Sequence, residues 1–297
     1  MSRVLVTGSE GFIGSSLIKK LLSEGHQLAT LDLKKNSDRE HHLICNLAET
    51  NPTDFFMAFK PDVVIHLAAQ IVVTASMSYP ENDLMINGLG TLRVVQASIS
   101  SGCKNFIYIH SGGAIYDSNA ELPLEESSPE RPVSPYGLSK NLGEGYVRVL
   151  SELVGANWSS LALSNCYGPV TKHGKGVIYH FWKALQDNKA PTINGPEVTR
   201  DFVYVSDVID AICLAMQKPT NCRINISSGS EISLIQLYKL IQVEIGSSIE
   251  PSIYHHIPGE ILRSCLSNKK AHKVLNWQPK IDLEQGIKLS FGSESND

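Results

Sequence analysis

The chain has little of what marks membrane, nucleic-acid-binding or disordered proteins. No apolar run approaches the ~20 residues that a membrane-spanning helix requires. Only 19% of the 297 residues are charged, and 26 basic side chains stand against 30 acidic ones, so the excess of positive charge that binds a phosphate backbone is missing. Hydrophobic residues make up 42% of the chain, which excludes wholesale disorder. We therefore expect a folded protein that neither spans a membrane nor binds nucleic acid.

The sequence also shows no export signal and no clustered cysteines. Residues 1–5 lead into an apolar run without the charged head, long apolar stretch and cleavage site of a signal peptide. The six cysteines are scattered, and the pairs His41-His42 and His255-His256 have no carboxylate or cysteine at a useful spacing. We expect a cytoplasmic protein with free thiols and no metal site, in which both histidine pairs are surface or loop residues.

The first half of the chain alternates short apolar runs, rich in branched residues, with stretches of helical spacing. Such runs are typical of parallel strands that are covered on both faces. The predicted strands are 4–6, 27–31, 62–67 and 106–109, and the predicted helices are 12–22, 89–99 and 138–150. This alternation predicts an α/β fold with a doubly wound parallel sheet, the Rossmann architecture.

The second half has more proline and glycine, and its elements look shorter. We therefore place a boundary near residue 166. Residues 1–166 are predicted to form the Rossmann domain, to which segments near 205–228 return. Residues 167–297 are predicted to form a smaller, mixed α/β substrate-binding lobe.

A glycine loop follows the first predicted strand and opens the first helix. Gly8, Gly11 and Gly14 permit a tight turn and let the backbone approach a pyrophosphate at the helix N-terminus. Asp32 ends the second strand, where a carboxylate accepts both ribose hydroxyls and repels a 2′-phosphate. The pattern predicts a dinucleotide site that prefers NAD to NADP, although Lys34 and Lys35 just beyond could tolerate a phosphate.

A tyrosine and a lysine four residues apart start the helix predicted near 138–150. Tyr136 and Lys140 share one helical face after a proline-rich loop. Tyr179 and Lys183 have the same spacing, but they lie in an aromatic-rich stretch that indicates packing. A phenol with a reference pKa of about 10 can act as a base near neutral pH only beside positive charge, such as a lysine ammonium and a nicotinamide cation.

A serine is placed to hold the substrate oxygen. Ser111 follows the strand predicted at 106–109, so it lies at the carboxyl edge of the sheet, where open α/β sheets bind ligands. Gly112 and Gly113 after it leave room for backbone and substrate. Ser111, Tyr136 and Lys140 are therefore the predicted catalytic residues.

Together these residues resemble the extended short-chain dehydrogenase/reductase family, which includes the nucleotide-sugar epimerases and dehydratases. The resemblance covers nearly the whole chain and extends to the segments 66–70, 87–91, 165–169, 200–207 and 275–280. Within the family it is greatest to the UDP-sugar 4-epimerases. It implies oxidation of the sugar at C4 by NAD, with Tyr136 taking the proton of the 4-hydroxyl, and return of hydride to the other face of the 4-keto sugar.

The resemblance also implies roles for further residues. Ser111 would bond the 4-oxygen, and Lys140 would bind the nicotinamide ribose and lower the pKa of Tyr136. Asn165 and Arg200 would hold the UDP diphosphate. The implied cofactor contacts are Gly8, Gly11, Phe12, Ile13, Gly14, Asp32, Asn46, Leu47, Leu67, Ala68, Ala69, Tyr136 and Lys140. A homodimer is implied as well, formed by the helices that start near Gly90 and Gly137.

Two departures from the family pattern shape the prediction. Dehydratases and decarboxylases of the family carry carboxylates just after the active-site serine or threonine, where this chain has Gly112 and Gly113, so elimination of water is not expected. The arginine that usually precedes a Pro-Gly-Asp segment is missing from 255–260, and Arg263 is the candidate substitute. An NAD(P)H-dependent 4-ketoreductase and a dinucleotide-binding regulatory protein without catalysis remain as alternatives.

Overall fold

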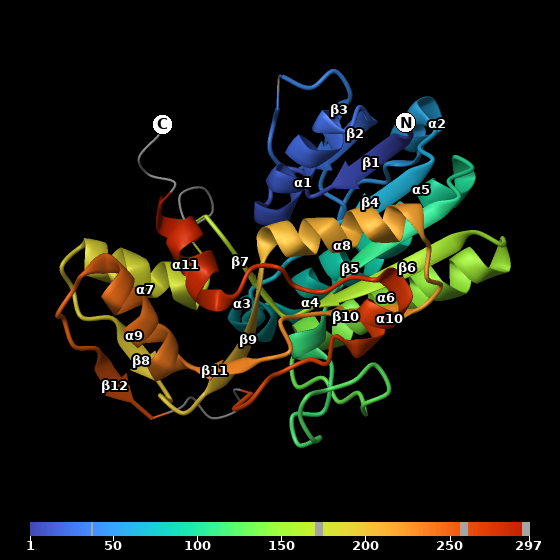
Figure 1. Ribbon diagram of the computed structural model, residues 1–297. Coiled ribbons are helices and arrows are strands. Elements are labelled where there is room, and N and C mark those ends of the chain that lie inside the picture. Colours follow the sequence, from blue (N-terminus) through green and yellow to red (C-terminus); the bar gives the residue numbers. More distant parts are fainter. Residues whose placement is uncertain (37, 170–174, 256–260, 293–297) are drawn as a thin grey trace.

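The computed structural model describes residues 1–36, 38–169, 175–255 and 261–292, and a seven-stranded sheet is its largest element (Figure 1). The strand order is β10-β6-β5-β4-β1-β2-β3, and every neighbouring pair is parallel. This confirms the predicted doubly wound α/β sheet. The strands are β1 (Arg3–Thr7), β2 (Gln27–Asp32), β3 (His42–Ile44), β4 (Val63–His66), β5 (Asn105–Ser111), β6 (Asn157–Leu163) and β10 (Arg223–Ile226).

Both faces of the sheet are buried because strand side chains alternate between two cores. In β1, Val4 and Val6 pack into one core and Leu5 packs into the other. Each core is closed by helices, which Figure 1 shows on either side of the sheet. The first is covered by α1 (Phe12–Ser23) and α8 (Val205–Gln217), and the second by α2 (Thr53–Phe59), α5 (Gly90–Ser100) and α6 (Pro135–Leu153).

The predicted strands and helices of the first half are confirmed, with two corrections. His42 is not a loop residue: it starts β3, and its Nδ1 lies 2.8 Å from Oγ1 of Thr30 on β2. A three-residue edge strand is too short to show a pattern in the sequence. The helix predicted from residue 89 is preceded by a π-helix, η1 (Leu84–Leu89), which continues directly into α5.

The chain leaves the large sheet after β6 and builds a second lobe (Figure 1). Two small sheets form there, one in the order β11-β9-β7 and one that pairs β12 with β8. The elements are β7 (Asn165–Tyr167), β8 (Thr192–Asn194), β9 (Thr199–Tyr204), β11 (Glu231–Ser233), β12 (Ser252–Tyr254), α7 (Val177–Gln186), α9 (Leu234–Ile245) and α11 (Leu283–Phe291). Between them, α8 and β10 return to the large sheet.

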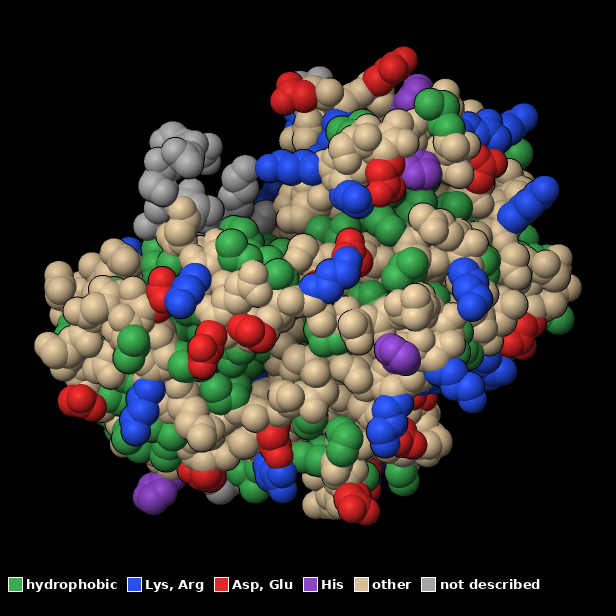
Figure 2. Space-filling view, in the orientation of Figure 1, with side chains coloured by type: hydrophobic (Ala, Val, Ile, Leu, Met, Phe, Trp, Pro, Cys, Tyr) green, Lys and Arg blue, Asp and Glu red, His purple; other side chains and the backbone are tan. Residues whose placement is uncertain are grey.

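The remaining described helices are α3 (Val73–Ser78), α4 (Pro80–Asp83), the 3₁₀ helix η2 (Gly112–Ala114) and α10 (Lys269–Leu275). The π-helix η1 joins α4 to α5. None of the described helices is long and apolar enough to cross a membrane. All six cysteines are free. Figure 2 shows charges of both signs mixed over the visible face, with no large basic patch.

A buried carboxylate ties the second lobe to the large sheet. Asp201 of β9 is 1% exposed, and its oxygens accept hydrogen bonds from Ser228 Oγ at 2.7 Å and from the backbone N–H groups of Ser228 at 3.0 Å and Leu266 at 3.2 Å. Ser228 follows β10, so one side chain connects the two sheets. Burial raises the pKa of Asp201, and these hydrogen bonds oppose that rise.

We predict that Asp201→Ala lowers the free energy of unfolding by about 3 kcal/mol or more, because several buried donors lose their acceptor. Asp210→Ala is the matched control: Asp210 forms a 2.6 Å ion pair with exposed Lys280, so its loss should cost less than about 1 kcal/mol. Urea denaturation measures both. Equal losses in the two variants would contradict the role given to Asp201.

Candidate active site

The glycine loop joins β1 to α1 and crosses the end of β4. Gly8 has a φ of 69°, and a Cβ there would lie 2.7 Å from the backbone nitrogen of Ala68. A Cβ on Gly14 would lie 2.2 Å from the carbonyl oxygen of Gly8, so the loop closes only with glycine at these positions. α1 begins at Phe12, and within the described chain no side chain caps it at Gly11. Its first N–H groups are therefore available to an anion.

Two predicted adenosine contacts follow the next strands. The Asp32 carboxylate ends β2 and accepts hydrogen bonds from the backbone N–H groups of Glu10 at 2.9 Å and Lys34 at 3.1 Å. The first of these bonds holds the carboxylate against the glycine loop. Asn46 follows β3, and its Oδ1 accepts from the N–H of Ala48 at 3.1 Å, which leaves this oxygen a second lone pair.

The carboxyl ends of β1 and β4 lie where the strand order reverses, which is the usual ligand site of such sheets. There Thr7 of β1 accepts two hydrogen bonds at 3.2 Å. The N–H of Leu67 donates to the Thr7 carbonyl, and the N–H of Ala68 donates to the Thr7 Oγ1. The other predicted contacts follow carboxyl ends of the same sheet, namely Phe12 and Ile13 after β1, Leu47 after β3 and Ala69 after β4. The glycine cradle with Asp32 beside it fits a dinucleotide.

Tyr136 lies in the first turn of α6, which two serines hold in place. Its backbone N–H donates to Oγ of Ser76 at 3.2 Å, and the N–H of Gly137 donates to Oγ of the N-cap residue Ser134 at 3.2 Å. Pro135 occupies the first helical position, where its fixed φ suits the helix. The start of α6 is therefore fixed on both sides of the tyrosine.

A close backbone contact brings this turn to Ser111. A Cβ on Gly137 would lie only 2.2 Å from the carbonyl oxygen of Ala114, in the short helix η2 that follows Ser111. Because residue 137 is glycine, the first turn of α6 approaches the turn after Ser111 closely, and Ser111 lies near enough to Tyr136 to lower the pKa of its phenol. The structure thus brings the predicted serine and tyrosine together.

Lys140 lies one turn further along α6 and is 3% exposed. Its Nζ donates to the carbonyl of Ile109 on β5 at 2.7 Å and lies 4.1 Å from the ring centre of Tyr108. Burial lowers the pKa of Lys140 to about 7, against the opposing effect of the Glu144 and Asp83 carboxylates. The ammonium is thus held on the strand that ends in Ser111.

The expectation that Lys140 lowers the pKa of Tyr136 concerns the site with its cofactor and stays a prediction. Burial raises the pKa of Tyr136, and the hydrogen bond with Ser111 is what lowers it, while the Asp83 carboxylate raises it further. The Lys140 ammonium bonds a backbone carbonyl instead. Sequence spacing showed that the two side chains share a helical face, but not what burial does to the phenol.

A buried polar cluster behind the tyrosine was missed in the sequence. The Asp83 carboxylate is fully buried and accepts from Ser139 Oγ and from Gln70 Nε2, the latter at 2.8 Å. Asn87 of η1 exchanges two hydrogen bonds with the backbone of Gln70, at 2.9 and 3.0 Å. These bonds fix the loop after β4 to α6. Asn87 lies in a segment that carried the family resemblance, whereas nothing around Asp83 set it apart from a surface carboxylate.

A second network that sequence reasoning missed supports Ser111 through the preceding residue of β5, His110. His110 accepts from the N–H of Ser111 at 2.8 Å through Nδ1, and its Nε2 lies 2.9 Å from Oδ1 of Asn141. Burial lowers the pKa of His110 to about 3, so the ring is neutral near pH 7. Nearby, Arg223 Nε donates to Glu144 at 2.8 Å. Glu144 lies one turn after Lys140 on α6. This four-residue spacing was the one sequence signal that could have placed Glu144 near the site.

The candidate substrate contacts lie on the neighbouring strands β7 and β9. Asn165 starts β7 at the surface, and its Oδ1 would lie 3.9 Å from a Cβ on Gly113, two residues after Ser111. Arg200 of β9 donates through Nη1 to the carbonyls of Thr199 and Ile261, each at 2.8 Å. The structure therefore places Asn165 at the catalytic turn and Arg200 on the next strand.

Arg263 is held elsewhere. It forms an ion pair with Glu231, and its side chain is 60% exposed. Glu231 pairs with Asp201 across β11 and β9, so its side chain lies on the opposite face of β9 from Arg200. The structure does not bring Arg263 to Arg200. Residues 256–260, where the missing arginine was sought, lie outside the described residues.

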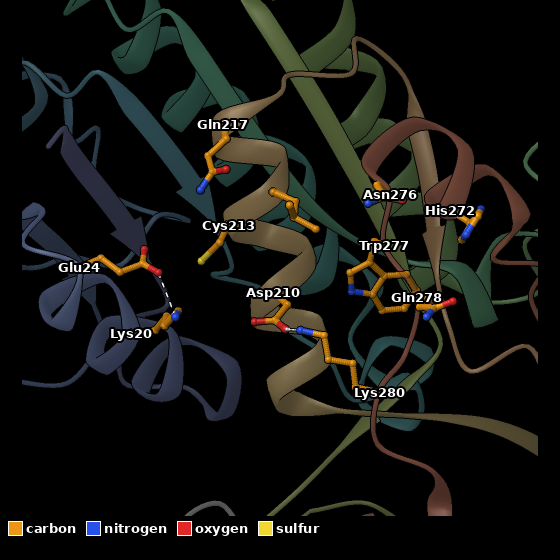
Figure 3. Close-up of a pocket in the computed structure, with 11 residues that line it drawn as sticks. Lys20, Glu24, Asp210, Cys213, Gln217, His272, Asn276, Trp277, Gln278 and Lys280 are labelled. Atoms are coloured by element: carbon orange, nitrogen blue, oxygen red, sulfur yellow. Dashed lines mark hydrogen bonds and ion pairs between the residues drawn. The ribbon is translucent and has the colours of Figure 1, made fainter.

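A groove on another part of the molecule contains none of these residues. It has a volume of about 450 Å³ and lies between α1, α8 and the segment 276–280 (Figure 3). Two ion pairs, Lys20 with Glu24 at 3.0 Å and Lys280 with Asp210 at 2.6 Å, line it. The candidate active site is therefore the edge of the sheet that carries the glycine loop, Ser111 and Tyr136.

We predict that Lys140→Met removes a pH dependence of stability. Because the pKa of Lys140 is about 7 when folded and 10.5 ordinarily, the unfolded chain binds more protons between these values. The free energy of unfolding of the wild type therefore rises with pH by up to about 1.4 kcal/mol per unit in this window, and the variant lacks that rise.

Urea denaturation of both proteins at about pH 7 and about pH 9 gives their free energies of unfolding. The difference between wild type and Lys140→Met should be about 2 kcal/mol larger at pH 9 than at pH 7, in favour of the wild type. Lys183→Met is the control, because Lys183 is exposed and ion-paired with Asp187. Parallel changes in the wild type and Lys140→Met would contradict the prediction.

Comparison with known proteins agrees with this geometry. The chain is 35% identical over 300 residues to the UDP-glucose 4-epimerase of Mycolicibacterium smegmatis, covering 96% of each chain. Its structure is similar to that of a UDP-glucose 4-epimerase from Thermotoga maritima with UDP-glucose, at a TM-score of 0.92, 33% identity and 97% coverage of both chains. It is also similar to that of a UDP-glucose 4-epimerase from Thermus thermophilus in complex with NAD, at a TM-score of 0.88, 32% identity and 97% coverage of both.

A family model supports the same assignment. Residues 4–227 match the model described as the NAD dependent epimerase/dehydratase family. This span includes the glycine loop, Asp32, Ser111, Tyr136 and Lys140. The protein belongs to the NAD dependent epimerase/dehydratase family.

Proposed function

We propose that the protein is an NAD-dependent epimerase that acts at C4 of a UDP-hexose or UDP-N-acetylhexosamine through a 4-keto intermediate. The observation that carries the proposal is the close approach of the first turn of α6 to the turn after Ser111, which brings Tyr136 to this serine with Lys140 buried one turn away, at the sheet edge that also holds the glycine loop. A phenol, a hydroxyl and an ammonium in this arrangement suit removal and return of a proton at a sugar hydroxyl.

Tyr136 is the acid–base group of the proposed mechanism. Its phenolate oxygen takes the proton of the 4-hydroxyl and later gives it back. Ser111 donates a hydrogen bond to the 4-oxygen and so orients it toward Tyr136. Since burial keeps the pKa of the Tyr136 phenol high, the phenolate needs added positive charge in the loaded site. Lys140 supplies part of that charge from one turn along α6.

The cofactor-binding residues are those of the glycine loop, together with Asp32, Asn46, Leu47 and residues 67–69. When bound, NAD supplies the acceptor and donor of the C4 hydride. Asp32 would hold the adenosine ribose hydroxyls, and the N-terminus of α1 would hold the pyrophosphate. Lys140 would hold the nicotinamide ribose.

The second lobe, from about residue 167 onward without α8 and β10, would bind the UDP-sugar. Asn165 and Arg200 are the proposed diphosphate ligands, with Arg200 forming charge-assisted hydrogen bonds. Arg263 can join them only by leaving Glu231, because the two now form an ion pair.

The surroundings of Ser111 favour epimerisation over loss of water. A family dehydratase has carboxylates after this position, and the present chain has Gly112 and Gly113. A Cβ on Gly112 would lie 2.4 Å from the Leu266 side chain, so the turn has no room for an acidic side chain there without a shift. Proton transfer at carbons beyond C4 therefore has no group at this turn to perform it.

An exposed apolar face on α6 supports a homodimer. Its exposed side chains recur along one side of the helix, at Leu138, Leu142, Val149 and Leu153. A Cβ on Gly88 of η1 would lie 2.9 Å from exposed Leu84 and 3.2 Å from Leu142, so η1 extends the same face. A second copy of the chain would cover these side chains.

Free thiols at all six cysteines support a cytoplasmic location.

The activity is tested with a panel of UDP-hexoses and UDP-N-acetylhexosamines, followed by separation of the C4 epimers. We expect interconversion of one such pair and no net change in nicotinamide absorbance. Consumption of NADPH with a 4-keto sugar, and no epimer, would instead identify a ketoreductase. Dinucleotide binding without any turnover would favour a regulatory protein.

Replacement of the catalytic tyrosine has a matched control in the same chain. Tyr136→Phe should lower kcat at least about 100-fold, because the proton loses its acceptor. Tyr179→Phe should leave kcat unchanged, since the ring of Tyr179 packs at 5.7 Å from that of Trp182. Full turnover by Tyr136→Phe would refute the assignment.

The dimer is tested by charge on its proposed face. Leu142→Glu should change the solution mass from twice 32.5 kDa to the monomer value, as measured by light scattering after gel filtration. Val243→Glu, on α9, is the control because Val243 is exposed outside that face. A monomeric wild type would remove the dimer proposal.

A further inference from the structure

A charged cluster borders the glycine loop on the side of Asp32. Glu10 lies within the loop, and its Oε1 is 2.5 Å from Nη1 of Arg39, while its Oε2 accepts from Nδ2 of Asn36 at 3.2 Å. The side chains of Glu10 and Arg39 are each 20% exposed. The backbone N–H of Glu10 donates to the Asp32 carboxylate at 2.9 Å. The Asp32 carboxylate, assigned to the adenosine ribose, is thus bonded to the backbone of Glu10, whose own side chain is paired with Arg39.

The Glu10–Arg39 contact is one of charge more than of directed hydrogen bonding. Nη1 of Arg39 is buried, and among the described residues it meets no acceptor in hydrogen-bonding geometry. A guanidinium has five N–H donors in a planar fork that matches a phosphate. Arg39 thus has donors to offer, and the ion pair with Glu10 determines where they lie.

NAD and NADP differ only at the 2′-position of the adenosine ribose, where NADP carries a dianionic phosphate. In the wild-type arrangement this phosphate would meet the Asp32 carboxylate, and the nearby positive charge of Arg39 is balanced by Glu10, the residue whose backbone N–H bonds Asp32. Without Glu10, one negative charge is lost and the guanidinium is released beside the ribose. The chemistry of the cluster therefore opposes a 2′-phosphate through two residues besides Asp32.

We propose that Glu10 is a second specificity-determining residue, which restricts the protein to NAD by holding Arg39 in an ion pair and away from the 2′-position. The inference rests on the proposed function, in that a dinucleotide binds at the glycine loop. It assigns to Arg39 a concealed capacity to bind phosphate, which appears only when Glu10 is removed.

Other cations near the ribose do not explain such a choice. Lys34 and Lys35 are exposed, and each carries a hydrated point charge on a flexible stem. They are present in the wild type and in every variant of Glu10. A gain in NADP binding that depends on Arg39 would therefore separate the guanidinium from both lysines.

The test measures which dinucleotide the protein holds, so it needs no turnover. The full-length wild type, Glu10→Ala, Glu10→Gln, Arg39→Ala and the double variant Glu10→Ala/Arg39→Ala are incubated with equal concentrations of NAD and NADP. Native mass spectrometry then gives the ratio of bound NADP to bound NAD. Melting temperatures show that each variant is folded, and Glu10→Gln retains the size and the Asn36 contact if alanine disturbs the loop.

We expect the ratio to rise at least tenfold in Glu10→Ala and Glu10→Gln, and to return close to the wild-type value in the double variant. Arg39→Ala alone should not raise it. Glu24→Ala is the matched control for net charge, because Glu24 is paired with Lys20 at the other end of α1 (Figure 3) and its loss should leave the ratio unchanged.

The outcomes separate this inference from the one beneath it. An unchanged ratio in both Glu10 variants, or an equal rise in the double variant, would overturn the role of the Glu10–Arg39 pair while leaving NAD binding intact. A wild type that holds neither dinucleotide would overturn the proposed function and this inference together.

Discussion

The contact between Gly137 and Ala114 is the constraint on which the candidate site depends. A Cβ at residue 137 would overlap the Ala114 carbonyl, so only glycine allows the first turn of α6 to lie on the short helix after β5. That approach places Tyr136 against Ser111 and directs Lys140 to the Ile109 carbonyl. A backbone contact, made possible by one missing methyl group, thereby joins the strand that carries the serine to the helix that carries the tyrosine and lysine.

Near this contact, burial disfavours the charged forms of Tyr136 and Lys140, so the site needs further charge from its ligands. Burial raises the pKa of Tyr136 and lowers that of Lys140, so the protein alone disfavours the charged form of each. The Asp83 and Glu144 carboxylates support the ammonium from the buried side. A cationic ring beside the phenol would favour its ionised form, and this links proton transfer to occupancy of the dinucleotide site. Ionisation of Tyr136 in the unloaded protein is thus disfavoured by electrostatics.

Much of the fold and part of the site could be predicted from the sequence because their signals are local. A short apolar run rich in branched residues marked β1 as a strand with two buried faces, and three glycines at fixed spacing marked the turn after it. The spacing of Tyr136 and Lys140 placed both on one face of a helix. Edge strand β3 and helix η1 were missed, since a three-residue strand and a widened helical turn leave no periodic pattern.

The sequence by itself indicated the α/β class, the glycine loop, the carboxylate that ends β2 and the identity of the serine, tyrosine and lysine, because each of these has a short local pattern. Only the tertiary structure decided which distant groups act on them. Asp201 reaches Leu266, Arg263 is drawn to Glu231, and Arg39 returns to Glu10, through contacts that no spacing predicts. Burial, which alters the pKa values of Tyr136 and Lys140, likewise arises only when separate elements pack together. Electrostatic energy depends on distance in space and on exclusion of water, and neither can be read from position along the chain.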